Sequence, residues 1–316
     1  MGKFKTSWSL FRSSLSVIGN NKKLLLFPII GFIFVVIIGL FFLSPVLLWD
    51  SGHSITELSH WQTLGQHIHN TFGNKKVSGG MVIEQMFGNY WYAWFVLFYL
   101  ISMFSTTFLN VAFYNEIING LNGKRVSLLR GIKVALSKIK LIMIWSLFAG
   151  AIGLIIRNLE ERLGFVGKLI MGLIGIAWSV ASIFVIPVII REEKSSNPIK
   201  LLRTSALMLK RTWGEAVIGY AGISVFSLLI FVISLLLLFV ACIFCIGMNI
   251  PNAGAIIIML IFIYTISMLM FAYLSAIANH VYRGALYVYA SEGVIPGSFD
   301  EDMMNKAWKV KKAKKI

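Results

Sequence analysis

Long unbroken runs of apolar residues constrain the fold of this chain more than any other feature. A helix needs roughly 20 apolar residues to cross the hydrocarbon core of a bilayer. Five segments reach that length: Leu24–Trp49, Tyr90–Ile118, Val166–Ile190, Ala216–Ile246 and Ala253–His280. Only 13% of the residues are charged, about half the roughly 25% of an ordinary soluble domain. The sequence therefore predicts an all-α integral membrane protein.

A sixth segment, Leu141–Ile156, is shorter than a full span because it holds sixteen residues. Lys138 and Lys140 extend it, since a lysine can bury its stem in hydrocarbon while its ammonium group stays at the interface. The alternative is a re-entrant segment, which would reverse the orientation of everything that follows.

The distribution of positive charge decides between these alternatives. If all six segments cross and the N-terminus is cytoplasmic, 24 of the 29 lysines and arginines lie inside and 5 outside. A re-entrant third segment would place the basic stretch Arg191–Arg211 outside. Because positive loops are retained in the cytoplasm, the sequence predicts six transmembrane helices with both termini cytoplasmic.

Three prolines lie near the ends of predicted spans: Pro28, Pro45 and Pro187. A proline removes one backbone donor, and this costs little at the end of a helix. These prolines therefore need no explanation in terms of transport.

A short motif recurs before the first, third and fifth segments. Its copies read SLFR, SLLR and KLLR, and they end at Arg12, Arg130 and Arg203. The recurrence predicts three hairpins, each preceded by a cytoplasmic amphipathic interfacial helix, in repeat units of about 1–118, 119–190 and 191–290. Chance matching of a four-residue string is the alternative.

Apolar residues at spacings of three and four form one face on each of these short helices. We expect helices over Phe4–Ile18, Leu128–Ile139 and Ile199–Trp213 to lie in the interface, where their arginines contact anionic headgroups. The middle helix departs from the pattern, because Lys133 stands where the register predicts an apolar residue. Three interfacial helices with exposed arginines could also bind a cytoplasmic partner protein. The simpler alternative is that the helices only fix where each hairpin enters the membrane.

The other parts of the chain are small. Residues 1–290 form a single membrane domain, and its outer segment, residues 50–88, holds a short surface helix with Leu58 and Trp61 on its apolar face. Residues 291–316 form a basic cytoplasmic tail.

Histidines in the outer segment raise the question of a metal site or a pH sensor. His53, His60 and His67 recur every seven residues, with Glu57 and His69 nearby. Seven residues correspond to about 10 Å along a helix, too far for two neighbours to bind one ion. We expect a solvated polar face and no metal site.

Cys242 and Cys245 have the C-x-x-C spacing of redox motifs. A redox motif needs a thiolate, which apolar surroundings disfavour, and no basic residue is near. We expect two buried, unreactive cysteines.

Polar residues gather near the cytoplasmic ends of the second and last predicted spans: Asn110, Asn115, Glu116, Asn119, His280 and Arg283. A carboxylate inside a span is costly and usually faces a partner or a water-filled cavity. We therefore expect Glu116 to contact His280 or Arg283. The functional interpretation is a site for a substrate or a proton at the inner mouth. The alternatives are polar contacts between helices or a glutamate that reaches headgroup water.

Motifs for catalysis or cofactor binding are absent from the sequence, which has no nucleophile elbow, Walker motif or HExxH motif. It predicts a protein that is not an enzyme and uses no cofactor or metal. The net charge of +16 comes from basic residues beside the apolar runs. This placement indicates membrane lipids as partners, especially anionic headgroups, and not nucleic acid.

Several stretches resemble a known family. They are the FLNVA string at 108–112, the RGALYVYA string at 283–290, the GVIPGSFD string at 293–300, and LLLFP at 24–28 after a helix that bears Trp8. The chain resembles domain-of-unknown-function family 6159, polytopic membrane proteins of prokaryotes. The resemblance implies six spans in a prokaryotic cytoplasmic membrane, and it implies no activity and no functional residues.

Two classes of function fit these features. The first is a non-enzymatic permease or transport accessory for a small or lipid-like molecule, suggested by repeated hairpins beside a polar cluster. The second is a membrane scaffold or envelope-homeostasis factor whose interfacial helices bind anionic lipid or a partner protein. A polar cavity that reaches Glu116 would favour transport, and a solid apolar bundle would favour a scaffold.

Overall fold

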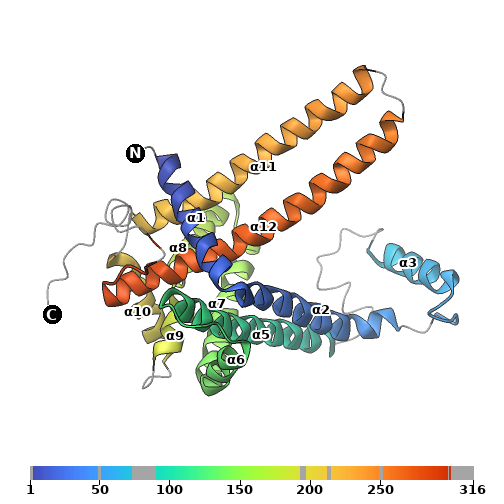
Figure 1. The fold of residues 1–316 in the computed structure, drawn as a ribbon. Coiled ribbons are helices and arrows are strands. Elements are labelled where there is room, and N and C mark those ends of the chain that lie inside the picture. Colours follow the sequence, from blue (N-terminus) through green and yellow to red (C-terminus); the bar gives the residue numbers. More distant parts are fainter. Residues whose placement is uncertain are drawn as a thin grey trace.

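The computed structural model describes residues 3–48, 51–72, 90–192, 197–211, 215–248, 252–297 and 299. These residues form helices joined by loops, with no β-strand among them (Figure 1). Six helical segments in the described part are long and apolar enough to cross a membrane: Lys22–Pro45, Ala93–Leu121, Ile139–Arg162, Phe165–Arg191, Val225–Gly247 and Ala253–Glu292. The predictions of an all-helical fold and of six such segments are confirmed.

The first pair of long helices is α2 (Leu26–Leu47), which follows the short 3₁₀ helix η1 (Lys22–Leu25), and α5 (Tyr90–Leu121). Their outer ends are joined by aromatic contacts, with the Phe42 and Trp94 rings 4.7 Å apart. The Trp94 indole also donates a hydrogen bond to the Phe42 carbonyl at 3.1 Å. In the sequence, helix α3 (Leu58–Phe72) of the outer segment lies between α2 and α5.

The third segment is longer than its apolar core. After α6 (Leu128–Ser137), α7 runs from Ile139 to Arg162, 24 residues, which gives a length of about 36 Å. The polar residues Arg157–Arg162 continue the helix beyond the apolar run, with an ion pair of Arg157 and Glu161 at 3.1 Å. The structure therefore has a helix of spanning length where the sequence offered sixteen apolar residues.

The fourth segment is interrupted and forms two helices. Helix α8 (Phe165–Ala181) ends in a turn over residues 182–184, and α9 (Val185–Arg191) follows. Pro187 explains the break, because it cannot donate to the carbonyl four residues earlier and its ring crowds the preceding turn.

A serine on the next short helix compensates for the break. Helix α10 (Pro198–Arg211) packs against α8 and α9. The fully buried Ser205 donates to the Ala181 carbonyl at 2.6 Å and accepts from the Phe184 amide at 3.0 Å. Backbone groups that lose their helical partners are thus satisfied in a buried place, as the cost of an unpaired buried group requires.

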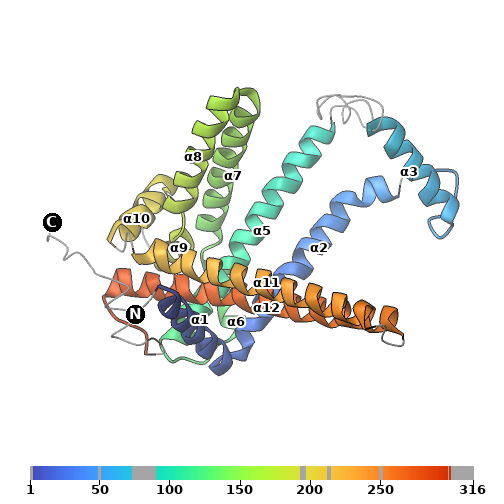
Figure 2. The same cartoon turned by 90° about the horizontal axis from the view of Figure 1, so that it is seen from above.

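The last two helices, α11 (Glu215–Gly247) and α12 (Ala253–Glu292), pack side by side. Helix α12 holds 40 residues, a length of about 60 Å. Its first half is exposed and apolar, whereas most of its second half, from Ser275 to Tyr289, is buried. The three pairs of long helices diverge from one common end of the molecule, which we call the base (Figures 1 and 2).

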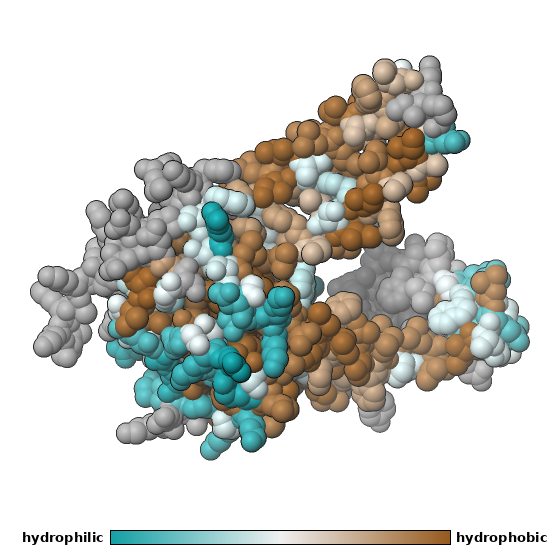
Figure 3. All heavy atoms as spheres, in the orientation of Figure 1, coloured by the Kyte–Doolittle hydropathy of each residue, from teal (hydrophilic) through white to brown (hydrophobic). Residues whose placement is uncertain are grey.

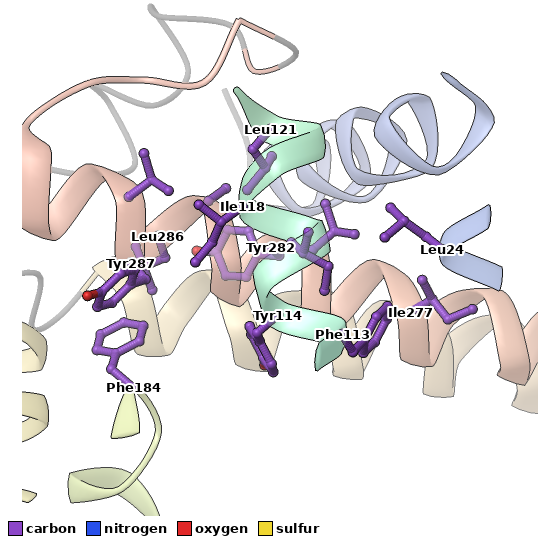
Figure 4. Packing of buried hydrophobic residues seen from close by; sticks show 14 of the residues in the cluster. Leu24, Phe113, Tyr114, Ile118, Leu121, Phe184, Ile277, Tyr282, Leu286 and Tyr287 are labelled. Atoms are coloured by element: carbon purple, nitrogen blue, oxygen red, sulfur yellow. The ribbon is translucent and has the colours of Figure 1, made fainter. Parts of the chain in front are cut away.

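The base contains the hydrophobic core. Helix α5 crosses the second half of α12, and Figure 4 shows Phe113 and Ile118 of α5 directed toward α12. The crossing is close: a Cβ at Gly284 would lie 2.6 Å from the Ile117 Cγ2. Phe184, in the turn of the broken fourth segment, packs on Tyr287 with ring centroids 5.9 Å apart.

Polar and apolar surfaces are separated on the molecule. Hydrophilic residues gather over the base, while the projecting helices are mainly hydrophobic (Figure 3). Exposed side chains such as Phe32 on α2, Leu237 on α11 and Ile258 on α12 belong to this apolar surface. Exposing an apolar surface of this extent to water is unfavourable, which indicates that lipid surrounds these helices.

The short helices pack into the base, and each of them buries one face there. In α1 (Lys3–Asn20) the buried face includes Leu10 and Val17, while Trp8 is half exposed. In α10 the buried residues include Leu201, Ser205 and Leu209, whereas Ile199 is exposed. Contacts with neighbouring helices thus select one face of each short helix for burial.

The chain after α12 turns back onto the base. Gly293, at φ +70, ends α12 in the left-handed conformation, and its amide donates to the Tyr289 carbonyl at 2.9 Å. Pro296 and Phe299 are buried. The first residues of the predicted tail thus belong to the folded domain, and residues 300–316 lie outside the described part.

Candidate functional site

The predicted polar cluster separates into two regions in the structure. Asn115, Glu116 and Asn119 form a network with Arg130 of α6. Asn110, His280 and Arg283 line a cavity that Glu116 does not reach. We call these regions the Glu116 network and the central cavity.

The centre of the network is an ion pair between a buried carboxylate and an interfacial arginine. Glu116 is fully buried. The Arg130 Nε and terminal nitrogen donate to its two oxygens at 2.9 and 2.6 Å, the bidentate geometry that gives strong, oriented pairs. The cationic partner of Glu116 thus comes from α6, whereas the sequence suggested His280 or Arg283 of the last span.

Neutral donors complete the hydrogen bonding of the carboxylate. The Ser127 amide donates to Glu116 Oε2 at 2.7 Å, and the side-chain amides of Asn115 and Asn119 donate to Oε1 at 2.8 and 3.4 Å. With the two Arg130 nitrogens, five donors thus surround the buried carboxylate. The arrangement favours a structural role for Glu116.

Local sequence explains how α6 comes to lie beside α5. Gly123, at φ +73, allows the chain to turn after α5. Ser127 then caps α6 by accepting from the Arg130 amide at 3.5 Å. At Gly131 a Cβ would lie 2.8 Å from the Ala112 carbonyl oxygen, so only glycine permits this approach of the two helices.

The same contacts stabilise the charge on Arg130. Its hydrogen bonds to Glu116 raise the pKa of the Arg130 guanidinium above its usual range, although partial burial acts in the opposite direction. Because a raised pKa keeps the cation at every pH below it, the Arg130 guanidinium remains charged throughout the physiological range.

The three repeated arginines are not equivalent. Arg130 pairs with Glu116, while Arg12 on α1 and Arg203 on α10 are exposed at the surface of the base. The recurring motif therefore places arginines at three short helices but gives only one of them this internal partner.

The central cavity has a volume of about 420 Å³ and lies between α5, α8, α9, α10 and α12. Its polar wall carries Asn110, Tyr114, His280 and Arg283. The interrupted fourth segment also lines it and contributes these residues: Trp178, Ser179, Val180, Ser182, Ile183 and Ile186. The cavity is thus amphipathic, and the break in the fourth segment lies directly at it.

His280 is held at the edge of this cavity by α5. Its Nδ1 lies 3.1 Å from the Tyr114 hydroxyl, and its ring packs against the Phe113 and Tyr114 rings at 5.5 Å. His280 and Asn110 also line a second, smaller cavity of about 190 Å³ between α2, α5 and α12. The two cavities therefore adjoin at these two side chains.

A third cleft, of about 510 Å³, lies between α7 and α8 and is lined by charged residues that include Arg157, Glu160 and Lys168. It shares Trp178 and Ser179 with the central cavity. Trp178 stacks on Trp145 with centroids 6.0 Å apart and planes at 6°, which fixes the orientation of its ring.

Among the outer-segment histidines, His60 differs from the expectation. It is fully buried, with Nδ1 2.7 Å from the Ser51 hydroxyl and Nε2 3.2 Å from the Leu47 carbonyl, so the predicted solvated face is wrong at this position. His53 lies 3.7 Å from Glu57 in an exposed pair. The side chains of His67 and His69 lie outside the described part, which contains no group of three or more potential metal ligands.

The two cysteines form no disulfide. Cys245 is buried and Cys242 is partly exposed on α11. The expectation that both are buried thus holds for Cys245.

Sequence reasoning missed the residues of the fourth segment that line the cavity, Trp178, Ser179 and Ser182. The available signal was Pro187, which lies four residues after Ile183 and prevents a continuous helix there. Tyr114 was also missed, since a tyrosine among apolar residues carries no polar signature of its own.

These features together define a helical, multi-pass membrane protein with an amphipathic cavity at one end of its helices. The sequence pattern of a family of unknown function, DUF6159, matches residues 89–297, and the chain belongs to that family. The match begins at α5 and contains both the Glu116 network and the central cavity, but it leaves the first span outside, so the resemblance at residues 24–28 lies beyond it. No curated protein and no solved structure matches the chain significantly.

Proposed function

We propose that this protein binds a lipid-like molecule in the central cavity and acts as a non-enzymatic permease or transport accessory. The observation that carries the proposal is the interruption of the fourth segment at the cavity wall. Irregular backbone at membrane depth is tolerated where it is buried in protein or lines a cavity. Discontinuous helices of this kind form the binding sites of many transporters.

The lining supports an amphipathic ligand. Hydrogen-bonding groups from Asn110, Tyr114 and His280 line the cavity together with the apolar side chains of Ile183 and Ile186. Small-molecule sites typically combine such an apolar lining with a few polar groups that orient the ligand. The described lining offers no carboxylate, which supports a role in binding.

The proposed orientation places the base at the cytoplasmic side of a prokaryotic cell membrane, with both termini cytoplasmic. Six spans would then form three hairpins, with α1, α6 and α10 as interfacial helices beside their inner ends. The support is the excess of lysine and arginine toward the base, because positive charge is retained inside.

The binding proposal is tested by filling the cavity. The Ile186→Trp variant should lose a lipid that the wild-type protein retains in detergent, as measured by native mass spectrometry. The matched control is Leu173→Trp, an exposed position of α8 outside the cavity, which should retain that lipid. Equal retention by all three proteins, or none in the wild type, would contradict the proposal.

A scaffold that binds anionic lipid or a partner protein is the second candidate, favoured by the exposure of Arg12 and Arg203 on the base. The double variant Arg12→Gln/Arg203→Gln should then weaken binding to vesicles that contain phosphatidylglycerol. Arg130 is left unchanged in this test, because its loss would disturb the Glu116 network. Unchanged vesicle binding would remove the support for this role.

A further inference from the structure

We infer that the bound molecule is an anionic phospholipid of the base-side leaflet, with its headgroup in the central cavity and one acyl chain in the smaller cavity. This inference rests on the proposed function and specifies its ligand. It follows from how the two cavities adjoin, from the chemistry of their walls, and from the direction in which they are arranged along α5 and α12.

The two cavities adjoin at two shared side chains and differ in the chemistry of their walls. Asn110 and His280 line both of them. Beyond this junction the smaller cavity is mainly apolar, with Phe27, Leu109 and Phe113 among its lining residues. A molecule that fills both must carry a polar group on one side of the junction and a hydrocarbon group on the other.

The hydrocarbon end opens toward the membrane surface of the protein. The smaller cavity is lined by Phe34 and Val35, whose exposures of 48% and 58% place them on the apolar outer face of α2. An acyl chain can therefore enter laterally from the bilayer. A water-soluble solute has no reason to occupy this end.

The order of the two ends matches a lipid in the leaflet nearest the base. Along α12, the central cavity extends from His280 to Leu286, about 9 Å further toward the base. Along α5, the smaller cavity begins at Ser105, one turn or more before the central cavity's Asn110 and Tyr114. The headgroup would thus point toward the base and the chain toward the centre of the membrane.

The charge of the headgroup end favours an anion. Arg283 lines the central cavity, and no aspartate or glutamate is among the described residues that line either cavity. The nearest carboxylate of the predicted cluster, Glu116, is directed to Arg130 instead. A guanidinium matches the geometry of a phosphate group.

The inference is tested with the full-length protein in mixed micelles that contain equal amounts of phosphatidylglycerol and phosphatidylcholine with identical chains. Native mass spectrometry should find phosphatidylglycerol enriched about fivefold over phosphatidylcholine on the wild-type protein, as expected for one cationic contact of about 1 kcal/mol. Arg283→Gln should abolish the enrichment, and Arg283→Lys should preserve most of it. Arg203→Gln, an exposed arginine outside the cavities, is the control for nonspecific charge.

The acyl end is tested on α2. Gly31 lines the smaller cavity and has room for a side chain, since the nearest atom to an added Cβ is 3.9 Å away. Gly31→Phe should reduce retention of both lipids at least tenfold. Gly39→Phe, on the same helix but away from the cavity, should retain them.

The outcomes separate this inference from the proposed function. Retention of both lipids in the bulk ratio by the wild type and by Arg283→Gln would refute an anionic headgroup but leave lipid binding intact. Full retention by Gly31→Phe would refute the acyl site. No retained lipid on the wild type would refute the proposed function itself. Thermal unfolding of each variant identifies misfolding, and Arg283→Lys keeps the charge test decisive if Arg283→Gln unfolds.

Discussion

The Glu116 network and the central cavity contain side chains of the same kind at similar distances from the base, yet they are built in opposite ways. In the network, both carboxylate oxygens are saturated by donors within 3.4 Å and no cavity touches the carboxylate. In the cavity, Asn110, His280 and Arg283 face a space of about 420 Å³. The comparison teaches that polar groups inside a membrane protein divide into those that hold helices together and those that remain available to a ligand.

Substitutions in the Glu116 network should therefore change mainly stability, and substitutions in the central cavity should change mainly ligand binding. Breaking a buried ion pair leaves an uncompensated charge and costs several kcal/mol. Asn110 lines the central cavity and takes no part in the Glu116 network, so its removal should change ligand retention more than folding.

The largest expected effect is at the ion pair. Arg130→Leu should lower the free energy of unfolding by about 3–5 kcal/mol, because it leaves the Glu116 carboxylate buried without its cationic partner. The measurement is unfolding of the purified protein in mixed micelles with increasing SDS. The double variant Glu116→Leu/Arg130→Leu should recover part of the loss, and the exposed Arg203→Leu should change stability by about 0.5 kcal/mol or less. A loss below about 1 kcal/mol in Arg130→Leu would show that the network is not structural.

The close approach of α5 and α6 should give the next largest effect. Gly131→Ala places a methyl group 2.8 Å from the Ala112 carbonyl oxygen, and overpacking of this kind costs about 1–3 kcal/mol. The matched control is Gly172→Ala in α8, where an added Cβ has no neighbour within 4 Å and the helix should gain about 0.5–1 kcal/mol. Equal behaviour of the two variants would contradict the observed packing.

The hydrogen bonds that Ser205 makes at the break in the fourth segment should have a smaller but measurable effect on stability. Ser205→Ala leaves the Phe184 amide and the Ala181 carbonyl without their partner, which should cost about 1–3 kcal/mol. Ser44→Ala, whose hydroxyl bonds to the Phe41 carbonyl within its own helix, is the control and should be nearly neutral. Hydrogen exchange at residues 182–185 should also accelerate in Ser205→Ala; unchanged exchange would argue against this role of Ser205.

The smallest effect on stability is expected in the cavity. Asn110→Ala should change the free energy of unfolding by about 0.5 kcal/mol or less, while retention of phosphatidylglycerol falls. The same SDS titration and native mass spectrometry provide both readouts. A large loss of stability with unchanged retention would reverse the proposed division between the two regions.

The comparison also shows where reading the sequence succeeded and where it failed at the site. The six residues proposed as one cluster are polar and near the base, as expected. Their pairing was not predicted, although Arg130 lies only fourteen positions after Glu116 in the printed sequence. The signals were local: Gly123 permits the turn, Ser127 begins a new helix, and Gly131 permits contact. Their consequence could be recognised only from the structure, in which α6 packs against α5.

The sequence by itself determined the helical fold and the six helices of spanning length, because long apolar runs satisfy their backbone hydrogen bonds internally and need no knowledge of their neighbours. It also indicated at which ends of the helices most of the positive charge gathers, since this follows from the positions of lysine and arginine along the chain. Only the tertiary structure decided that Arg130 neutralises Glu116, that Ser205 repairs the break before Pro187, and that Asn110 and His280 join two cavities. Each of these depends on which faces of separate helices meet, and that choice is made by packing and by the pairing of buried polar groups over the whole base.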